Sequence, residues 1–231
     1  MLVKPKRTLS LFRINRRFLL NHPGSLVRYP LVRKAFPHSM LSYTALCQMS
    51  DVVEAVERNG IEGDIAELGC WKGGCGAVMG KILDTLASKK RVWLFDSFEG
   101  LPEPTKEDAS WKGAEKGDYA VTEEDVFAAL TAVGADRRRF EVIRGWFQDS
   151  VPGVKERMGK LSVLHLDGDT YGSTKCCLEM LYDSVSPGGY IVFDDYHLEG
   201  CRKAIYEFFS SREMSPLLRW YQDGGRVFLV K

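Results

Sequence analysis

Several signals that would assign this chain to a familiar class are missing. No apolar run approaches the roughly 20 residues that span a bilayer, which argues against a membrane protein. The six cysteines form no Cys-x-x-Cys pair and have no zinc-ligand spacing with the four histidines. Neither a zinc domain nor a disulfide framework is therefore indicated, and reduced thiols are the state expected in the cytoplasm. No Gly-Lys-Ser/Thr follows the first glycine cluster, which excludes a phosphate-binding loop there.

Acidic residues are absent from the start of the chain. Residues 1–40 contain nine lysines and arginines, and the first acid is Asp51, so the formal net charge of +1 hides an acidic remainder. We predict a basic N-terminal arm over 1–39 and one catalytic domain over 40–231. Three arginines interrupt the only apolar stretch of the arm, which argues against a secretory signal. We expect the arm to wrap the domain or, in a homo-oligomer, a sister subunit. The alternative is that its charge docks on anionic lipid or a phosphorylated substrate. We expect no nucleic-acid partner.

The remainder alternates between short apolar strands and amphipathic helices. Strands are predicted at 64–69, 91–97, 140–145, 161–169 and 189–195, and helices at 40–60, 74–87, 122–133, 173–183 and 198–210. This alternation predicts a doubly wound, mostly parallel α/β sheet with ligands at the carboxyl ends of its strands. Residues 219–231 read as an antiparallel hairpin turning at Asp223-Gly224-Gly225. That hairpin favours the Rossmann-like class I methyltransferase fold over the dinucleotide-binding variant.

A glycine-rich turn joins the first strand to its helix, with the sequence Glu67-Leu-Gly69-Cys-Trp71-Lys-Gly73-Gly74. Glycines let the backbone approach a ligand closely, and a helix N-terminus offers free amides to a carboxylate or phosphate. The spacing does not match the Gly-x-Gly-x-x-Gly of dinucleotide folds. An acid two residues before the first glycine suits a ligand with an ammonium group, such as the methionine part of S-adenosylmethionine.

Asp96 ends the second strand, where a carboxylate can accept both ribose hydroxyls of a nucleoside. It does not distinguish S-adenosylmethionine from NAD. Trp146 and Phe147 follow the third strand, where they either stack on an adenine ring or pack in the core. The residues predicted to contact the cofactor are Glu67, Gly69, Trp71, Gly73, Gly74, Asp96, Ser97, Trp146, Phe147 and Asp167.

Four aspartates follow two later strands. Asp167 and Asp169 come at the end of the fourth, and Asp194 and Asp195 at the end of the fifth. If these strands are neighbours, four carboxylates converge at the ligand edge and repel one another. A divalent cation, protonation or basic partners must then neutralise them. Oxygen ligands without Cys or His favour magnesium, manganese or calcium over zinc.

The segments GDIAELGCWKGG, DSFEGLPEP, GWFQDS, LDGDTY and SPGGYIVFDDY resemble, in this order and spacing, the macrocin O-methyltransferase family. That family includes sugar O-methyltransferases of the mycinamicin and novobiocin pathways, and the match runs from about Met40 to Phe209. The resemblance implies a Rossmann-like methyltransferase fold and magnesium dependence. It also implies that Asp167, Asp194 and Asp195 hold the metal and that Asp169 is the general base.

The predicted function is therefore metal-assisted O-methylation of a small, sugar-like or polyol acceptor by S-adenosylmethionine. Residues 99–121, with Trp111 and Tyr119, are predicted to form a lid that excludes water. Two alternatives stay open: an NAD-dependent oxidoreductase of Rossmann type, and a non-catalytic nucleotide-binding protein. Neither accounts for four carboxylates at the ends of the fourth and fifth strands.

Overall fold

A computed structural model describes residues 27–221 and 225–231 of the chain. Within these ranges the strands are β1 (Asp64–Leu68), β2 (Val92–Asp96), β3 (Phe140–Arg144), β4 (Leu161–Leu166), β5 (Val185–Phe193), β6 (Arg219–Trp220) and β7 (Val227–Val230). The α-helices are α3 (Tyr29–Ala35), α4 (Tyr43–Arg58), α5 (Gly74–Thr85), α6 (Glu123–Val133), α7 (Phe147–Met158), α8 (Tyr171–Leu181) and α9 (Glu199–Ser211). Short 3-10 turns complete the described elements: η2 (Phe36–His38), η3 (Lys106–Asp108), η4 (Arg137–Arg139) and η5 (Tyr182–Ser184).

The seven strands form one sheet in the order β3-β2-β1-β4-β5-β7-β6. The first five run parallel, and β7 pairs antiparallel with both β5 and β6. The doubly wound sheet with a terminal antiparallel pair is therefore confirmed. The tip of the predicted hairpin, residues 222–224, lies outside the described residues.

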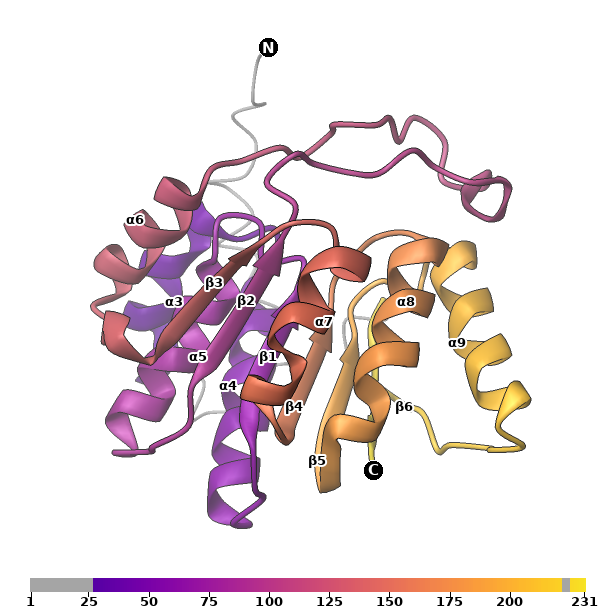
Figure 1. Ribbon diagram of the computed structural model, residues 1–231. Coiled ribbons are helices and arrows are strands. Elements are labelled where there is room, and N and C mark those ends of the chain that lie inside the picture. The colour runs from indigo at the N-terminus through magenta and orange to yellow at the C-terminus, as the bar shows by residue number, and fades with distance from the viewer. Residues whose placement is uncertain (1–26, 222–224) are drawn as a thin grey trace.

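Helices cover both faces of the sheet (Figure 1). On one face α3, α4, α5 and α6 pack against side chains such as Ile65 and Leu94. On the other face α7, α8 and α9 pack against side chains such as Trp93 and Phe193. Because strand residues alternate between faces, both layers of the core are built from the same short apolar strands.

Two helices were not predicted. Helix α7 contains Pro152 and Gly153, which read as a break, yet Pro152 is exposed and the apolar positions Val151 and Met158 still face the core. Helix α3 lies inside the segment predicted as a basic arm, and its Val32 and Ala35 are fully buried in the core. Burial of an amphipathic face outweighs local helix propensity in both.

The end of the predicted arm therefore packs on the domain over its described part. Arg28 pairs with Asp51 and Glu54 of α4. The arm residues 1–26 lie outside the described residues, so the predicted oligomer through the arm stays a prediction. No helix among the described residues is long and apolar enough to cross a membrane.

Candidate active site

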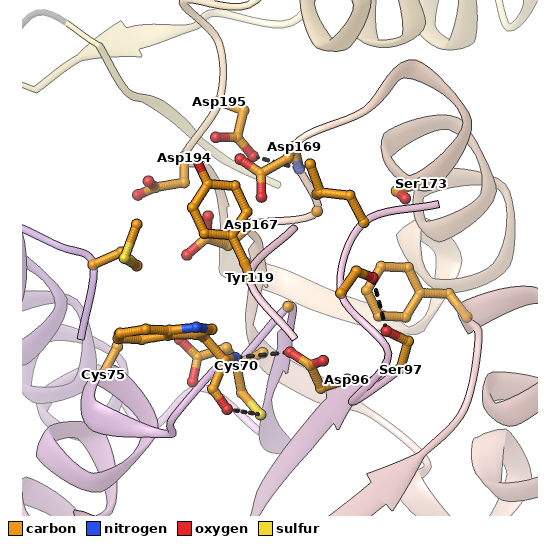
Figure 2. Close-up of a pocket in the computed structure, with 18 of the residues that line it drawn as sticks. Cys70, Cys75, Asp96, Ser97, Tyr119, Asp167, Asp169, Ser173, Asp194 and Asp195 are labelled. Carbon is orange, nitrogen blue, oxygen red and sulfur yellow. Dashed lines mark hydrogen bonds between the residues drawn. The ribbon is translucent and has the colours of Figure 1, made fainter. Parts of the chain in front are cut away.

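One cavity of about 390 Å³ lies at the carboxyl ends of the parallel strands. Eleven of the predicted site residues line it: Glu67, Gly69, Trp71, Asp96, Ser97, Trp146, Phe147, Asp167, Asp169, Asp194 and Asp195. Gly73 and Gly74 do not. Figure 2 shows the four later aspartates gathered on one side of the cavity, with Asp96 and Ser97 across from them. The cavity thus has a carboxylate-rich end and a separate end at the tip of β2.

The glycine-rich turn brings two loops into backbone contact. Gly69 has a φ of +97°, and a Cβ there would lie 1.8 Å from the carbonyl oxygen of Asp167. Gly73 adopts the left-handed conformation and caps α5. A Cβ on Gly74 would lie 2.5 Å from the carbonyl oxygen of His38, so this glycine admits the η2 backbone and does not face the cavity.

Replacing Gly69 by Ala is expected to destabilise the protein by at least about 1–3 kcal/mol, the usual cost of a strained backbone conformation. The contact with the β4 loop would also be forced apart. Urea unfolding measures the change. The matched control is Gly153→Ala, because a Cβ at Gly153 meets nothing within 4 Å and alanine favours the α7 helix. Equal stability of the two variants would contradict the close approach.

Two backbone amides hold the Asp96 carboxylate in place, one of them from the glycine-rich turn. Its Oδ2 accepts a hydrogen bond from the Trp71 amide at 2.8 Å, and its Oδ1 accepts one from the Phe98 amide at 2.9 Å. Burial raises the pKa of Asp96, and the two amides partly oppose that rise. Each carboxylate oxygen keeps a second lone pair, so Asp96 can still accept from a diol in the cavity.

Three of the four later carboxylates form a tight group. Ligand oxygens of Asp167, Asp169 and Asp195 all lie within 4.8 Å of one another, and the Asp169 amide donates to Asp195 Oδ2 at 2.9 Å. Strands β4 and β5 end at Leu166 and Phe193, earlier than predicted, so all four aspartates lie in the loops that follow. The turn is tight enough to give Asp169 a φ of +61°.

Burial and mutual repulsion disfavour the charged forms of this group. Both effects raise the pKa values of Asp167 and Asp195 well above the ordinary range. Burial, and then the charge of Asp194, raise the pKa of Asp169 to about 7. A bound cation would remove this penalty, since it supplies the opposite charge that the three carboxylates lack.

Asp194 has a different environment, which the sequence did not predict. Its Oδ1 lies 3.5 Å from His165 Nε2 and 3.5 Å from Arg226 Nη1. His165 and Arg226 are themselves buried, and Arg226 also bonds Gln48 of α4. The basic partners considered as one means of neutralisation are therefore present beside Asp194, and His165 also has an atom within 4.8 Å of Asp167.

His165 also lies between two acids that line the cavity, Glu67 and Asp194. Its Nδ1 lies 3.1 Å from Glu67 Oε1, while its Nε2 faces Asp194. Burial tends to lower the pKa of His165, but its bonds to Asp194 and Glu67 raise it to about 9. His165 lies two residues before Asp167 on β4, so alternation along a strand places both on one face. That spacing could have indicated His165 as a site residue from the sequence, whereas no comparable pattern pointed to Arg226.

A Tyr-x-x-x-Lys spacing, typical of one group of NAD-dependent reductases, occurs at Tyr171 and Lys175 of α8. The Tyr171 hydroxyl donates to Glu207 at 2.7 Å and lies 3.1 Å from Lys175 Nζ. Neither residue lines the cavity. This pair therefore gives no support to hydride transfer in the described site.

Residues 99–121, predicted as a lid, contribute four residues to the cavity wall: Gly100, Leu101, Pro102 and Tyr119. Trp111, also predicted to belong to the lid, does not line the cavity. Ser39, Met40 and Leu41, just before α4, line the cavity as well and were not predicted. Part of the cavity wall thus comes from segments that do not lie at the end of a strand, where the sequence predicted the site.

Comparison with solved structures defines the class. The O-methyltransferase NovP superposes with a TM-score of 0.77 at 30% identity, covering 84% of this chain and 82% of that one. The calicheamicin methyltransferase CalS11 has a TM-score of 0.73 at 19% identity over 100% of this chain and 94% of its own, which bears on the fold alone. The chain has the S-adenosylmethionine-binding fold of the class I methyltransferases.

The family follows from the sequence comparisons. Residues 30–228 match the family described as Macrocin-O-methyltransferase (TylF), and the chain belongs to this family of O-methyltransferases. A tetracenomycin-pathway relative from Streptomyces olivaceus, an 8-demethyl-8-(2,3-dimethoxy-alpha-L-rhamnosyl)-tetracenomycin-C 4'-O-methyltransferase, is 36% identical over 74% of this chain and 67% of its own. Mycinamicin III 3''-O-methyltransferase of Micromonospora griseorubida is 33% identical over 78% and 72%.

Proposed function

We propose that this O-methyltransferase transfers the methyl group of S-adenosylmethionine to a hydroxyl of a sugar-linked or polyol acceptor with the help of a divalent cation. The observation that carries the proposal is the close group of Asp167, Asp169 and Asp195, partly to fully buried, which lines one cavity together with Asp96. The relatives named above act on rhamnosyl-tetracenomycin and mycinamicin substrates, which supports a glycosylated acceptor.

The donor set fits a hard cation. Asp167, Asp194 and Asp195 are the proposed ligands, and carboxylate oxygens are what magnesium, manganese and calcium prefer. Bound there, the cation would lower the pKa of an acceptor hydroxyl and orient it. His165 Nε2 and Arg226 Nη1 each lie 3.5 Å from Asp194 Oδ1, and such partners restrict the orientation of a carboxylate that binds a metal.

The other end of the cavity fits the cofactor. Asp96 is proposed to accept the ribose hydroxyls, while Glu67 faces the ammonium of the methionine part. Glu67 is almost fully buried, and its Oε2 has no hydrogen-bond partner among the described residues. Such an oxygen costs free energy until a donor meets it. Trp146 and Phe147 line the same wall and are proposed to stack on adenine.

Asp169 is proposed as the general base. It lies in the carboxylate group yet is carried by the turn before α8, two residues beyond Asp167. From that turn it would take the proton of the acceptor hydroxyl as the oxygen forms a bond to the methyl carbon. The carbon–sulfur bond of S-adenosylmethionine would break at the same time, and S-adenosylhomocysteine would leave with its electron pair. Residues 99–121 are proposed to exclude water from this step, since Tyr119 lies beside the aspartates in Figure 2 and Leu101 also lines the cavity.

Replacing Asp96 by Ala is expected to weaken S-adenosylhomocysteine binding by about 1.5–3 kcal/mol, the usual contribution of hydrogen bonds to a charged group. Isothermal calorimetry measures it. The control is Glu99→Gln, an exposed carboxylate on the same loop outside the cavity wall. Unchanged affinity in Asp96→Ala would remove this residue from the cofactor site.

Thermal shift distinguishes the proposal from its oxidoreductase alternative. A ligand that binds only the folded protein raises its melting temperature by mass action. S-adenosylhomocysteine is expected to raise it, magnesium to raise it further, and NAD to leave it unchanged. Stabilisation by NAD without any response to S-adenosylhomocysteine would overturn the proposed cofactor.

A further inference from the structure

Residues 99–121, here called the lid segment, cross above the sheet edge and reach the ends of α8 and α9 (Figure 1). The two stems of the segment are tied to each other. The Leu101 amide donates to the Asp118 carbonyl at 2.8 Å, and the Gly117 amide donates to the Leu101 carbonyl at 3.0 Å. The stems line the cavity. The contacts of the tip with the rest of the protein therefore bear on whether the segment stays packed beside the cavity.

The tip is fastened through one buried carboxylate. Asp108 in η3 is only 4% exposed, although most of the lid segment is exposed. Its Oδ1 accepts a hydrogen bond from the Tyr171 amide of α8 at 2.8 Å. Its Oδ2 accepts from the amide and hydroxyl of Thr105, at 3.0 and 2.8 Å. The carboxylate thus organises the tip and binds the body of the protein at the same time.

Helix α9 leaves room for the Asp108 carboxylate because it has a glycine at the point of contact. Gly200 lies in the first turn of α9, and a Cβ there would lie 2.4 Å from Asp108 Oδ1 and 3.3 Å from the Tyr171 Cβ. Any larger residue would displace the carboxylate. Asp108 therefore sits between the N-terminal ends of α8 and α9, where a negative charge is favourable. At the rim, Lys203 of α9 lies 3.5 Å from Glu107.

The docking point is next to the proposed base. Tyr171 directly follows Asp169 and Thr170, which form the tight turn after β4. Asp195 accepts from the Asp169 amide at one end of this turn, and Asp108 accepts from the Tyr171 amide at the other. Lifting the tip would break the second of these bonds, so we expect the turn to loosen when the segment opens.

We propose that Asp108 is a positioning residue that fastens the lid segment over the cofactor cavity and fixes the turn carrying Asp169. The consequence for catalysis rests on the function proposed above, whereas the fastening itself does not. With Asp108 docked, Gly100, Leu101, Pro102 and Tyr119 of the lid segment line the cavity. Release of Asp108 frees this part of the wall, so we expect cofactor exchange to be faster after release.

Two variants test this from opposite sides. Asp108→Ala removes the carboxylate from the lid segment. Gly200→Ala places a methyl group of α9 where the Asp108 carboxylate binds, and alanine favours the helix. The matched control is Glu115→Gln, an exposed carboxylate on the same segment. Hydrogen exchange is measured on peptides covering 99–121 and 167–176. Stopped-flow tryptophan fluorescence measures S-adenosylhomocysteine release, because Trp71 and Trp146 line the cavity.

Both variants are expected to raise exchange in both peptides and to speed S-adenosylhomocysteine release by about tenfold or more, as loss of a hydrogen bond to a charged group implies. The double variant should add little to either single one, because both remove the same contact. Melting temperatures should fall only a few degrees below that of Glu115→Gln, because the lost contact also stabilises the folded protein.

Exchange and release rates like those of the control in both variants would overturn the proposal. Faster exchange in 99–121 with an unchanged 167–176 peptide would overturn its positioning part. If the wild type does not bind S-adenosylhomocysteine, the proposed cofactor is wrong, and the exchange measurements still decide whether Asp108 fastens the segment.

Discussion

Asp169→Asn is expected to lower kcat by roughly 10²–10⁴-fold, the usual contribution of a general base. Asparagine keeps the size of the side chain and its capacity to accept a hydrogen bond, but it does not take up the hydroxyl proton. The amide of residue 169 can still donate to Asp195, so the turn should persist. Affinity for S-adenosylhomocysteine and for magnesium should remain near that of the wild type. Label transfer from S-adenosylmethionine to an accepted acceptor measures the rate.

Asp169 could itself be a metal ligand, and the same variants test this. Asp169 groups with Asp167 and Asp195 more tightly than Asp194 does. If Asp169→Asn loses magnesium while Asp194→Asn keeps it, Asp169 is a metal ligand and the proposed roles are exchanged. If neither metal affinity nor turnover changes, Asp169 has no part in the reaction.

Asp195→Asn is expected to weaken magnesium binding by about 100-fold or more and to abolish measurable turnover. Loss of the hydrogen-bond partners around metal ligands already costs 10–100-fold, and loss of a ligand charge should cost more. Asparagine still offers an oxygen to the Asp169 amide, so the effect should come from the charge. Isothermal calorimetry with magnesium and the transfer assay are run on the same protein.

The matched control for Asp195→Asn is Glu179→Gln, an exposed acid on α8 outside the cavity. It removes the same charge from the surface and should leave magnesium affinity unchanged. Equal magnesium affinity in Asp195→Asn and Glu179→Gln would show that the group of aspartates after β4 and β5 does not hold the cation. Protonation of Asp167 and Asp195, or a basic acceptor, would then have to neutralise it.

The strand ends were predictable because a parallel sheet brings them to one edge. Glu67 lies near the end of β1, Asp96 ends β2, and Asp167 and Asp194 follow β4 and β5. All four line one cavity. The order of β4 beside β5 supports the assumption that their aspartates converge. Gly73 and Gly74 were grouped with these residues because they share the motif, but the structure uses them to cap α5 and to admit η2.

What escaped prediction depends on contacts between segments far apart in the sequence. Arg226 reaches Asp194 only because β7 returns beside β5, and the sequence around it reads as a turn. In the sequence Asp108 is one acid among several in a polar loop, and its burial against Tyr171 and Gly200 requires the complete fold. Helix α7 was hidden by Pro152, although its buried face repeats at helical spacing.

The most direct test is methyl transfer with and without chelation. The protein is incubated with methyl-labelled S-adenosylmethionine and a panel of glycosylated small molecules, in magnesium or in EDTA, and the products are analysed by mass spectrometry. We predict one labelled methyl group on a sugar hydroxyl, lost in EDTA and restored by excess magnesium. Full transfer in EDTA after metal removal, with no response to added magnesium, would contradict the metal-assisted account.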